Sequence, residues 1–224
     1  MPETDWTAGD VAVLDTETTG VDSSTDRVVE IAVVRLRKLL EVDAWSTRVN
    51  PGVPIPPEAR AVHGISDEDV AGAPPFAYFI PELAARLAGA QLLVYNAPFD
   101  VPLVNAEWQR GRALAPEGFS LAPFCLAVAE TLDPLVWIRD VDRYVPGKGR
   151  HQLAVTAKRW GIEVQGEAHG ALADCRLAAG IARKLVEAGR ISRDLAALLR
   201  RQEVRRAAQE QDFAAYRARL ANAG

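Results

Sequence analysis

Cysteine is scarce in this sequence, and long apolar runs are absent from it. Two cysteines in 224 residues cannot form a disulfide framework, so we expect a reducing compartment. No stretch approaches the ~18 apolar residues of a membrane-spanning helix. Segment 1–10 also carries charges where a signal peptide needs an apolar run. These absences predict a cytoplasmic protein without a membrane segment.

Neither sign of charge dominates the composition. The 26 basic and 30 acidic side chains give a net charge of −4, which excludes a histone-like basic wrapper and an acidic disordered tail. A protein with this balance binds nucleic acid only where metal ions or a local basic patch offset the phosphate charge. With 49% hydrophobic and 25% charged residues, the chain has the composition of a folded protein with one core.

The apolar pattern changes along the chain from strands in succession to strands alternating with helices. Apolar and β-branched runs predict five strands, at 10–15, 28–36, 39–49, 91–95 and 124–128. Helical spacing predicts helices at 75–87, 98–110, 152–160 and 171–188. Pro81 is expected to kink or break the first helix, and Gly111 to end the second. This order predicts an α/β fold with a mixed sheet.

The last part of the sequence, 190–224, differs in charge from the rest. Its eight arginines against four acidic residues give +4, which leaves −8 for the remainder of the net −4. Its apolar residues are sparse but roughly helically spaced. Two interpretations stay open, a solvated helix packed along the domain and a contact with nucleic acid or a partner protein.

Two carboxylates lie at the end of the first predicted strand. Asp15 and Glu17 are two residues apart, so the alternation of a strand puts both side chains on one face. Such close carboxylates repel each other unless a cation lies between them, which predicts a divalent metal or a shifted pKa. The pair alone is also compatible with solvated acids at a strand end.

Three further candidates lie in two later segments. Asp100 falls in the first turn of a helix that follows a buried strand, where the helix dipole favours an anion. Asp174 lies on the helix predicted at 171–188, and His169 on the glycine-flanked loop before it. Each alone is explained by an ordinary helix-start acid or a structural histidine. The four carboxylates and the histidine are informative only together.

In this order and spacing, the five residues resemble the DEDDh exonuclease superfamily. The resemblance covers about residues 8–188. Three signatures carry it, DTETTG at 15–20, NAPFD at 96–100 and HGALADC at 169–175. VHGISDE at 62–68 is similar to a piece of the proofreading epsilon-subunit branch of bacterial DNA polymerase III. The tyrosine variant of the superfamily would need Tyr at position 170, and Gly170 excludes it.

The resemblance implies a ribonuclease-H-like fold, and its limits together with the charge of the last part of the sequence divide the chain into two parts. The expected fold is a mixed five-stranded sheet, with three antiparallel strands first and then parallel strands, flanked by helices. The exonuclease domain would span 1–189, and 190–224 would form an arginine-rich helical extension. The implied reaction is hydrolysis from the 3′ end with two divalent ions, Mg²⁺ or Mn²⁺, which releases nucleoside 5′-monophosphates.

The resemblance also assigns roles to the five residues. Asp15 should bridge both metal ions, Glu17 and Asp174 should complete the site of the attacking water, and Asp100 should hold the second ion. His169 would be the general base, because an unperturbed histidine pKa near ~6.5 suits that role at neutral pH.

Substrate contacts are expected around the terminal nucleotide. The turn with Thr16, Thr18 and Thr19 is predicted to line its pocket through amides and hydroxyls. By resemblance to the epsilon branch, Glu58 would reach the terminal 3′-hydroxyl, and His63 and Phe99 would contact the nucleotide. The plainer alternatives are a helix-start acid for Glu58 and a core residue for Phe99.

Three functions stay open. The first is a free-standing DNA 3′-5′ exonuclease in proofreading, repair or DNA turnover, acting on single-stranded or frayed 3′ ends, with any polymerase or repair partner in a separate chain. The second is an RNA-trimming member of the same superfamily, which a pocket that accepts the 2′-hydroxyl would distinguish. The third is a non-catalytic module that binds nucleic acid or a polymerase. The complete set of five residues favours an enzyme.

Overall fold

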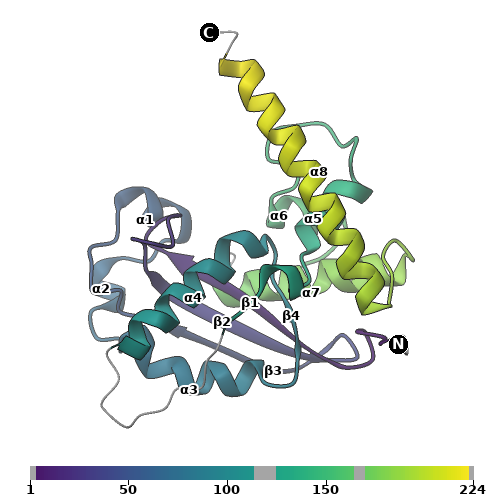
Figure 1. Cartoon of the computed structure of the whole chain (residues 1–224). Helices are drawn as coiled ribbons and strands as arrows, with labels where there is room; N and C mark the ends of the chain where they lie inside the picture. Colours follow the sequence, from purple (N-terminus) through teal and green to yellow (C-terminus); the bar gives the residue numbers. More distant parts are fainter. Residues whose placement is uncertain (1–3, 114–124, 164–169, 222–224) are drawn as a thin grey trace.

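The structure, a computed structural model, describes residues 4–113, 125–163 and 170–221 (Figure 1). Its strands are β1 (Asp10–Thr18), β2 (Val28–Arg37), β3 (Leu40–Arg48) and β4 (Gln91–Leu93). Its helices are α1 (Pro57–His63), α2 (Asp67–Val70), α3 (Phe76–Leu87), α4 (Ala97–Ala113), α5 (Pro134–Val141), α6 (Leu153–Arg159), α7 (Ala171–Glu187) and α8 (Leu195–Ala221), with a 3-10 turn η1 (Val128–Glu130).

The strands form one mixed sheet in the order β3-β2-β1-β4. β1 pairs antiparallel with β2 and parallel with β4, and β2 pairs antiparallel with β3. A two-residue turn joins β2 to β3, and both of its residues, Lys38 and Leu39, have positive φ (52° and 60°). This conformation matches the twist of a tight hairpin. The expected α/β fold with three antiparallel strands first and a parallel strand after them is confirmed.

The fifth strand expected at 124–128 is wrong for the described part of that range, 125–128. The amide of Leu126 donates to Asn105 Oδ1 and its carbonyl accepts from Asn105 Nδ2, both at 2.9 Å. The backbone there is therefore bonded to α4 instead of a strand. Within the part of the chain that the structure describes, only an isolated parallel bridge between Leu93 and Leu132 extends the sheet beyond β4. The sheet of the described residues has four strands.

Helices cover both faces of the sheet (Figure 1). On one face, Ala12 and Leu14 of β1 belong to a core cluster with residues of α3 and α4. On the other face, Val11 and Val13 belong to a cluster with residues of α5 and α7. β1 is thus buried on both sides and held rigidly at the centre of the sheet, which matters because its end carries two of the candidate residues.

The predicted helices form within a few residues of their expected limits, with one correction. Gly111 does not end its helix but lies inside α4. A Cβ at this position would come within 2.7 Å of Ile80 Cδ1 and 3.1 Å of Ala77 Cβ, so the glycine allows α3 and α4 to pack closely. Pro81 is accommodated within α3, which continues to Leu87. Gly161 follows α6 with φ +66°, as a helix-ending glycine does.

The long helix α8 has two different halves. Its first turns pack on the body, where Leu198 is 2% exposed and belongs to the same core cluster as α5 and α7. Its second half rises away from the body toward the C-terminus (Figure 1), and Phe213 and Tyr216 there are more than half exposed. Among the described residues, no helix is long and apolar enough to cross a membrane.

Candidate active site

Three of the predicted carboxylates come together where β1 ends beside α7. Oxygens of Asp15, Glu17 and Asp174 all lie within 4.8 Å of one another. The first two share a face because they are two residues apart in a strand, and the third is in the first turn of α7. All three are partly buried, and oxygen ligands of this kind suit a hard divalent cation.

Asp100 approaches the same place from α4. It is 3% exposed, and its Oδ1 accepts hydrogen bonds from the Thr16 amide at 3.0 Å and the Thr16 hydroxyl at 2.6 Å. Thr16 lies between Asp15 and Glu17 of β1, so these bonds fix α4 against the strand end. Asp100 lines the same groove as the three clustered carboxylates but is not part of their group.

Burial and mutual repulsion raise the pKa of these acids. The pKa of Asp15 is well above its ordinary value, first because the group is buried and then because Asp100 and Asp174 repel its charge. Burial raises the pKa of Glu17 to about 7, with Asp174 adding to the shift. Burial also raises the pKa of Asp100 to about 7, against the hydrogen bonds from Thr16. A divalent cation would remove the cause of the repulsion, so the residues fit a metal.

His169 lies outside the described residues, and its predicted role as a base stays a prediction. The start of the helix that follows it is described. Glu30 Oε2 accepts a hydrogen bond from the Ala171 amide at 3.1 Å, and Glu30 is 8% exposed. A buried carboxylate on β2 thus caps the N-terminus of the helix that carries Asp174. The sequence analysis did not identify Glu30. It could have been noticed as the single acidic residue within the apolar run VVEIAVV.

The three threonines predicted to bind substrate are buried, Thr16 within β1, Thr18 at its end and Thr19 at the start of the turn that follows. Thr18 Oγ1 donates to the Gly20 carbonyl at 2.6 Å, and Thr19 Oγ1 donates to Asp26 Oδ1 at 2.9 Å. Both hydroxyls thus stabilise the turn. Of the three threonines, only Thr16 lines the groove. A role of Thr18 and Thr19 in substrate binding stays a prediction.

The other predicted contacts lie on α1 and α4. Phe99 is half-buried in the first turn of α4 and lines the groove. His63 ends α1, is 8% exposed, and accepts a hydrogen bond from the Ile65 amide through Nδ1. Burial lowers the pKa of His63. Glu58 is exposed in the first turn of α1. Of these three residues, the structure brings only Phe99 to the groove wall.

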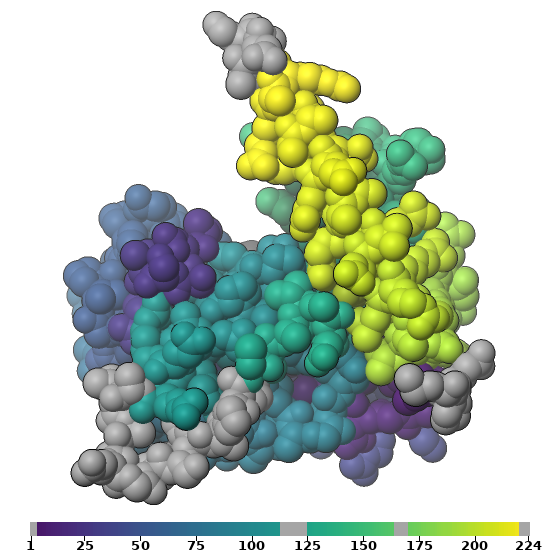
Figure 2. Space-filling model, in the orientation of Figure 1, coloured from purple at the N-terminus to yellow at the C-terminus, as the bar shows by residue number. Residues whose placement is uncertain are grey.

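The groove is larger than the carboxylate cluster. It has a volume of about 1280 Å³ and runs from the end of β1 along α5, the segment after it and the outer half of α8. Figure 2 shows the surface hollowed between the upper part of α8 and the α1 region. Tyr95 contributes to the floor, and its hydroxyl donates to the His151 carbonyl at 2.6 Å. The sequence predicted no part for residues 139–153 in the site.

Asp133 links the site to α8, and sequence reasoning missed it as well. It is 1% exposed and accepts hydrogen bonds from the Asn96 and Ala97 amides at 3.0 and 3.2 Å, where α4 begins. It also pairs with Arg206 of α8 at 3.2 Å. Burial raises the pKa of Asp133 despite these partners. In the sequence, Asp133 and Pro134 predict the start of a helix, but they do not predict the contacts of Asp133 with α4 and α8.

Residues 12–182 match the protein family described as Exonuclease (RNase_T), over more than half of the chain. The chain belongs to this exonuclease family. It is a 3′-5′ exonuclease, and the expected superfamily is confirmed. All four carboxylates lie inside the match, whereas α8 lies beyond it.

Proteins similar to this chain include an exonuclease and DNA polymerase III epsilon subunits. The chain is 32% identical to an uncharacterized exonuclease, CP81, of Escherichia phage 186, over 82% of this chain and 92% of that one. It is 33% identical to the DNA polymerase III subunit epsilon of Rickettsia conorii, over 75% of this chain and 70% of that one.

Solved structures have the same fold. A structure of exonuclease X in complex with 5′ overhanging duplex DNA covers 84% of this chain and 99% of its own, with a TM-score of 0.61 and 22% identity. A structure of exonuclease I covers 80% of this chain and 41% of its own, with a TM-score of 0.65 and 20% identity. The ribonuclease-H-like fold is thereby confirmed, and the described residues form four strands in place of the expected five.

Proposed function

We propose that this exonuclease hydrolyses DNA from the 3′ end and releases nucleoside 5′-monophosphates. The observation that carries the proposal is the cluster of Asp15, Glu17 and Asp174 within 4.8 Å, in one groove with Asp100. Two divalent ions, Mg²⁺ or Mn²⁺, would be held by these four carboxylates. Ions at such a site stabilise the attacking and the leaving oxygen of an in-line displacement at phosphorus.

The chain's own residues hold the carboxylates and α7 in place and accept the proton of the attacking water. Thr16 fixes the carboxylate of Asp100 through its amide and hydroxyl, and Glu30 fixes the start of α7. We assign the general base to His169, which takes the proton of the attacking water. Phe99 offers an aromatic face to the terminal base, which suits trimming without sequence preference.

The substrate contacts of the other predicted residues are part of the proposal. Glu58 would reach the terminal 3′-hydroxyl and His63 the terminal nucleotide, both from α1. Thr18 and Thr19 would line the pocket beside the terminal nucleotide, with their hydroxyls bonded within the turn and the Thr19 amide donating to the Arg27 carbonyl at 2.8 Å.

DNA is the favoured substrate because relatives of this chain are named DNA polymerase III subunit epsilon, and one similar structure holds duplex DNA. On the same ground we propose a role in proofreading, repair or DNA turnover, with a polymerase or repair protein as a separate partner chain. We also propose that 1–189 forms the catalytic domain and that 190–224 is an extension to it.

The test compares 5′-labelled DNA and RNA oligonucleotides of one sequence, each single- and double-stranded, with Mg²⁺ or Mn²⁺ and with EDTA. We expect a metal-dependent ladder that shortens from the 3′ end on DNA. A ladder on RNA alone would replace DNA by RNA as the substrate. No cleavage of either by folded, metal-supplied protein would reject the proposal.

A further inference from the structure

The groove continues well past the four carboxylates, onto α5, the segment after it and α8, and of these elements α8 lies outside the family match. Its volume of about 1280 Å³ exceeds the ~300–1,000 Å³ of pockets for small molecules. One wall consists of α5 and the segment up to Leu153, and the other of the outer half of α8 from Arg205 to Tyr216. A site for the terminal nucleotide alone does not need these walls.

The first wall carries exposed positive charge. Arg139, Arg143, Lys148 and Arg150 line the groove and are exposed, and none of them forms a salt bridge with a carboxylate of the described residues. Most arginines on the sheet, by contrast, are paired with an acid, as Arg35 is with Asp10. Unpaired cations that face a groove are suited to phosphate groups.

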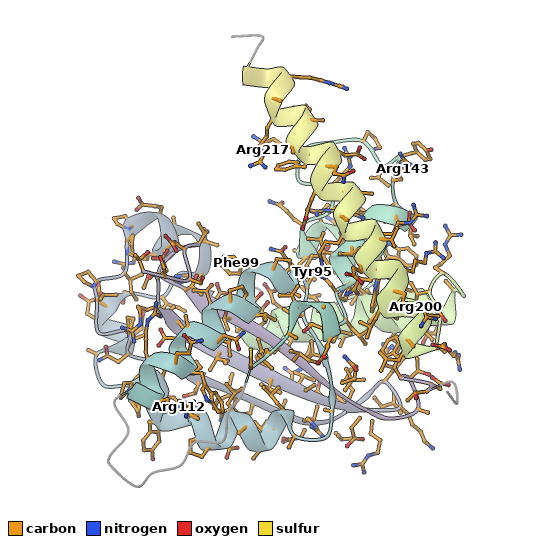
Figure 3. All side chains as sticks on the ribbon, in the orientation of Figure 1. Tyr95, Phe99, Arg112, Arg143, Arg200 and Arg217 are labelled. Carbon is orange, nitrogen blue, oxygen red and sulfur yellow. The ribbon has the colours of Figure 1, made fainter. Side chains whose placement is uncertain are left out.

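The second wall carries two aromatic side chains. Phe213 and Tyr216 line the groove and are 59% and 56% exposed. They are three residues apart on α8 and so lie on one helix face. The guanidinium of Arg217 lies 5.0 Å from the centre of the Phe213 ring. Figure 3 shows Arg217 on the same side of α8 as Phe99. Exposed aromatic faces are platforms on which bases stack.

Acidic residues also line the groove, and they reduce but do not cancel its positive charge. Asp140 pairs with Arg201 at 3.0 Å and with Arg205 at 3.3 Å, while Glu210 and Asp212 belong to the α8 wall. Outside the four catalytic carboxylates, the described lining thus contains these three acids against five cations, the four of the first wall and Arg205.

The outer half of α8 is held at a fixed place by its inner half. Gln202 Oε1 accepts from the Asp133 amide at 2.8 Å, and Arg206 pairs with the Asp133 carboxylate at 3.2 Å. Gln209 Nε2 donates to the Val136 carbonyl at 3.0 Å. These bonds anchor the helix as far as Gln209, so the aromatic wall begins one turn beyond a rigid support.

We propose that these two walls bind a single nucleic-acid strand behind its 3′-terminal nucleotide, with the cations on its phosphates and Phe213 and Tyr216 on its bases. The eleven-residue rise from Arg205 to Tyr216 spans ~17 Å. At ~3.4 Å per stacked nucleotide, that length accommodates about five nucleotides. The inference rests on the proposed function, because it places the strand whose end the carboxylates would cleave.

The first experiment measures the length dependence of hydrolysis. The double variant Phe213→Ala/Tyr216→Ala is compared with wild type on (dT)12, on (dT)3 and on the p-nitrophenyl ester of thymidine 5′-monophosphate. We expect the ratio of kcat/KM for (dT)12 over (dT)3 to fall about tenfold, mainly through KM for the longer strand. Tyr78→Ala is the matched control, since Tyr78 is 71% exposed on α3 and does not line the groove.

The second experiment measures binding without catalysis, as the fluorescence anisotropy of labelled (dT)12 in EDTA at several salt concentrations. Arg143→Gln/Arg150→Gln should reduce the salt slope by about 1.4, at ~0.7 for each phosphate that a cation no longer neutralises. Arg112→Gln/Arg200→Gln is the matched control, because both arginines are exposed and lie outside the groove lining (Figure 3).

The outcomes separate this inference from the proposed function. An unchanged length ratio together with an unchanged salt slope would overturn the groove assignment while leaving the exonuclease intact. An equal loss on all three substrates would also overturn it, since the helix would then act only through the fold. If wild type cleaves none of the substrates, the proposed function fails, and the salt slope in EDTA still tests the groove.

Discussion

The carboxylate cluster and the groove walls formed by α5, the segment after it and the outer half of α8 would bind a charged polymer in opposite ways. The carboxylate cluster brings acidic side chains of β1, α4 and α7 together, and burial and mutual repulsion therefore raise the pKa of Asp15. The groove walls expose aromatic rings on a helix that stands away from the body, and the exposed cations of α5 and of the segment after it lie across the groove from these rings. A cluster of like charges is useful only with a cation in it, whereas the exposed cations and rings of the two groove walls can contact a polyanion directly. The comparison predicts that chemistry and strand binding can be damaged separately.

The largest effect should come from Asp15→Asn. This variant removes the carboxylate at the centre of the cluster, so we expect kcat to fall at least ~1,000-fold on long and short substrates alike, including the nucleotide ester. Binding of (dT)12 in EDTA should persist, because the groove walls are untouched. Loss of binding together with activity would show that the two regions are not separable.

His169→Ala should have the next largest effect. A positioned general base is usually worth ~100-fold or more in rate, so turnover should fall by at least that factor. KM for (dT)12 should change little. Near-normal turnover of this variant in steady-state assays would remove the assignment of the base. His169→Gln, which keeps a polar side chain of similar size but supplies no base, serves as the second variant and should lose the same activity.

Sequence reasoning was reliable where function follows from local periodicity. The alternation of a strand placed Asp15 and Glu17 on one face, and the structure brings Asp174 to them from α7. The short hairpin between β2 and β3 was likewise readable from neighbouring β-branched runs. For the strand pair and the hairpin the information lies within a few residues of the feature, whereas Asp174, 159 positions from Asp15, was assigned to the site only through the resemblance to the superfamily.

Inference from the local sequence pattern was unreliable where a residue's partner is distant in sequence. Glu30 and Ala171 are 141 positions apart, and Asp133 and Arg206 are 73 apart. Gly111 looked like the end of a helix because its role, the close approach of α3 to α4, depends on Ile80. The fifth strand failed for the same reason, since the side chain of Asn105 bonds the backbone at Leu126.

Metal removal tests the electrostatics of the cluster. The folded pKa values of Glu17 and Asp100, about 7, lie above the ~4 of unfolded carboxyls. The metal-free folded state therefore holds more protons than the unfolded state, and its stability falls as pH rises from ~4 to about 7. A cation replaces those protons, so Mn²⁺ should stabilise more at pH 8 than at pH 6.

The measurement is the melting temperature in EDTA and in Mn²⁺ at both pH values. At a metal concentration ~100 times Kd the gain is about 2.7 kcal/mol, or ~5–10 °C for a chain of this size. Asp15→Asn should melt higher than wild type in EDTA at pH 8, because one repelling charge is gone, and should respond less to Mn²⁺. An equal response at both pH values would contradict this account.

The smallest effect should come from Arg206→Met, which tests how the two regions are joined. The substitution keeps the length of the side chain but leaves buried Asp133 without its cation, while the amides of Asn96 and Ala97 still bind the carboxylate. Because those bonds remain, we expect a loss of only ~1–2 kcal/mol, or ~2–8 °C in Tm, with Arg200→Met as the exposed control. The (dT)12 to (dT)3 ratio should fall with it, since α8 loses one of its anchors, whereas hydrolysis of the nucleotide ester should change less. A drop in ester hydrolysis as large as that on (dT)12 would mean that Arg206 supports the carboxylate site through α4, and the separation between the two regions would then fail at this residue.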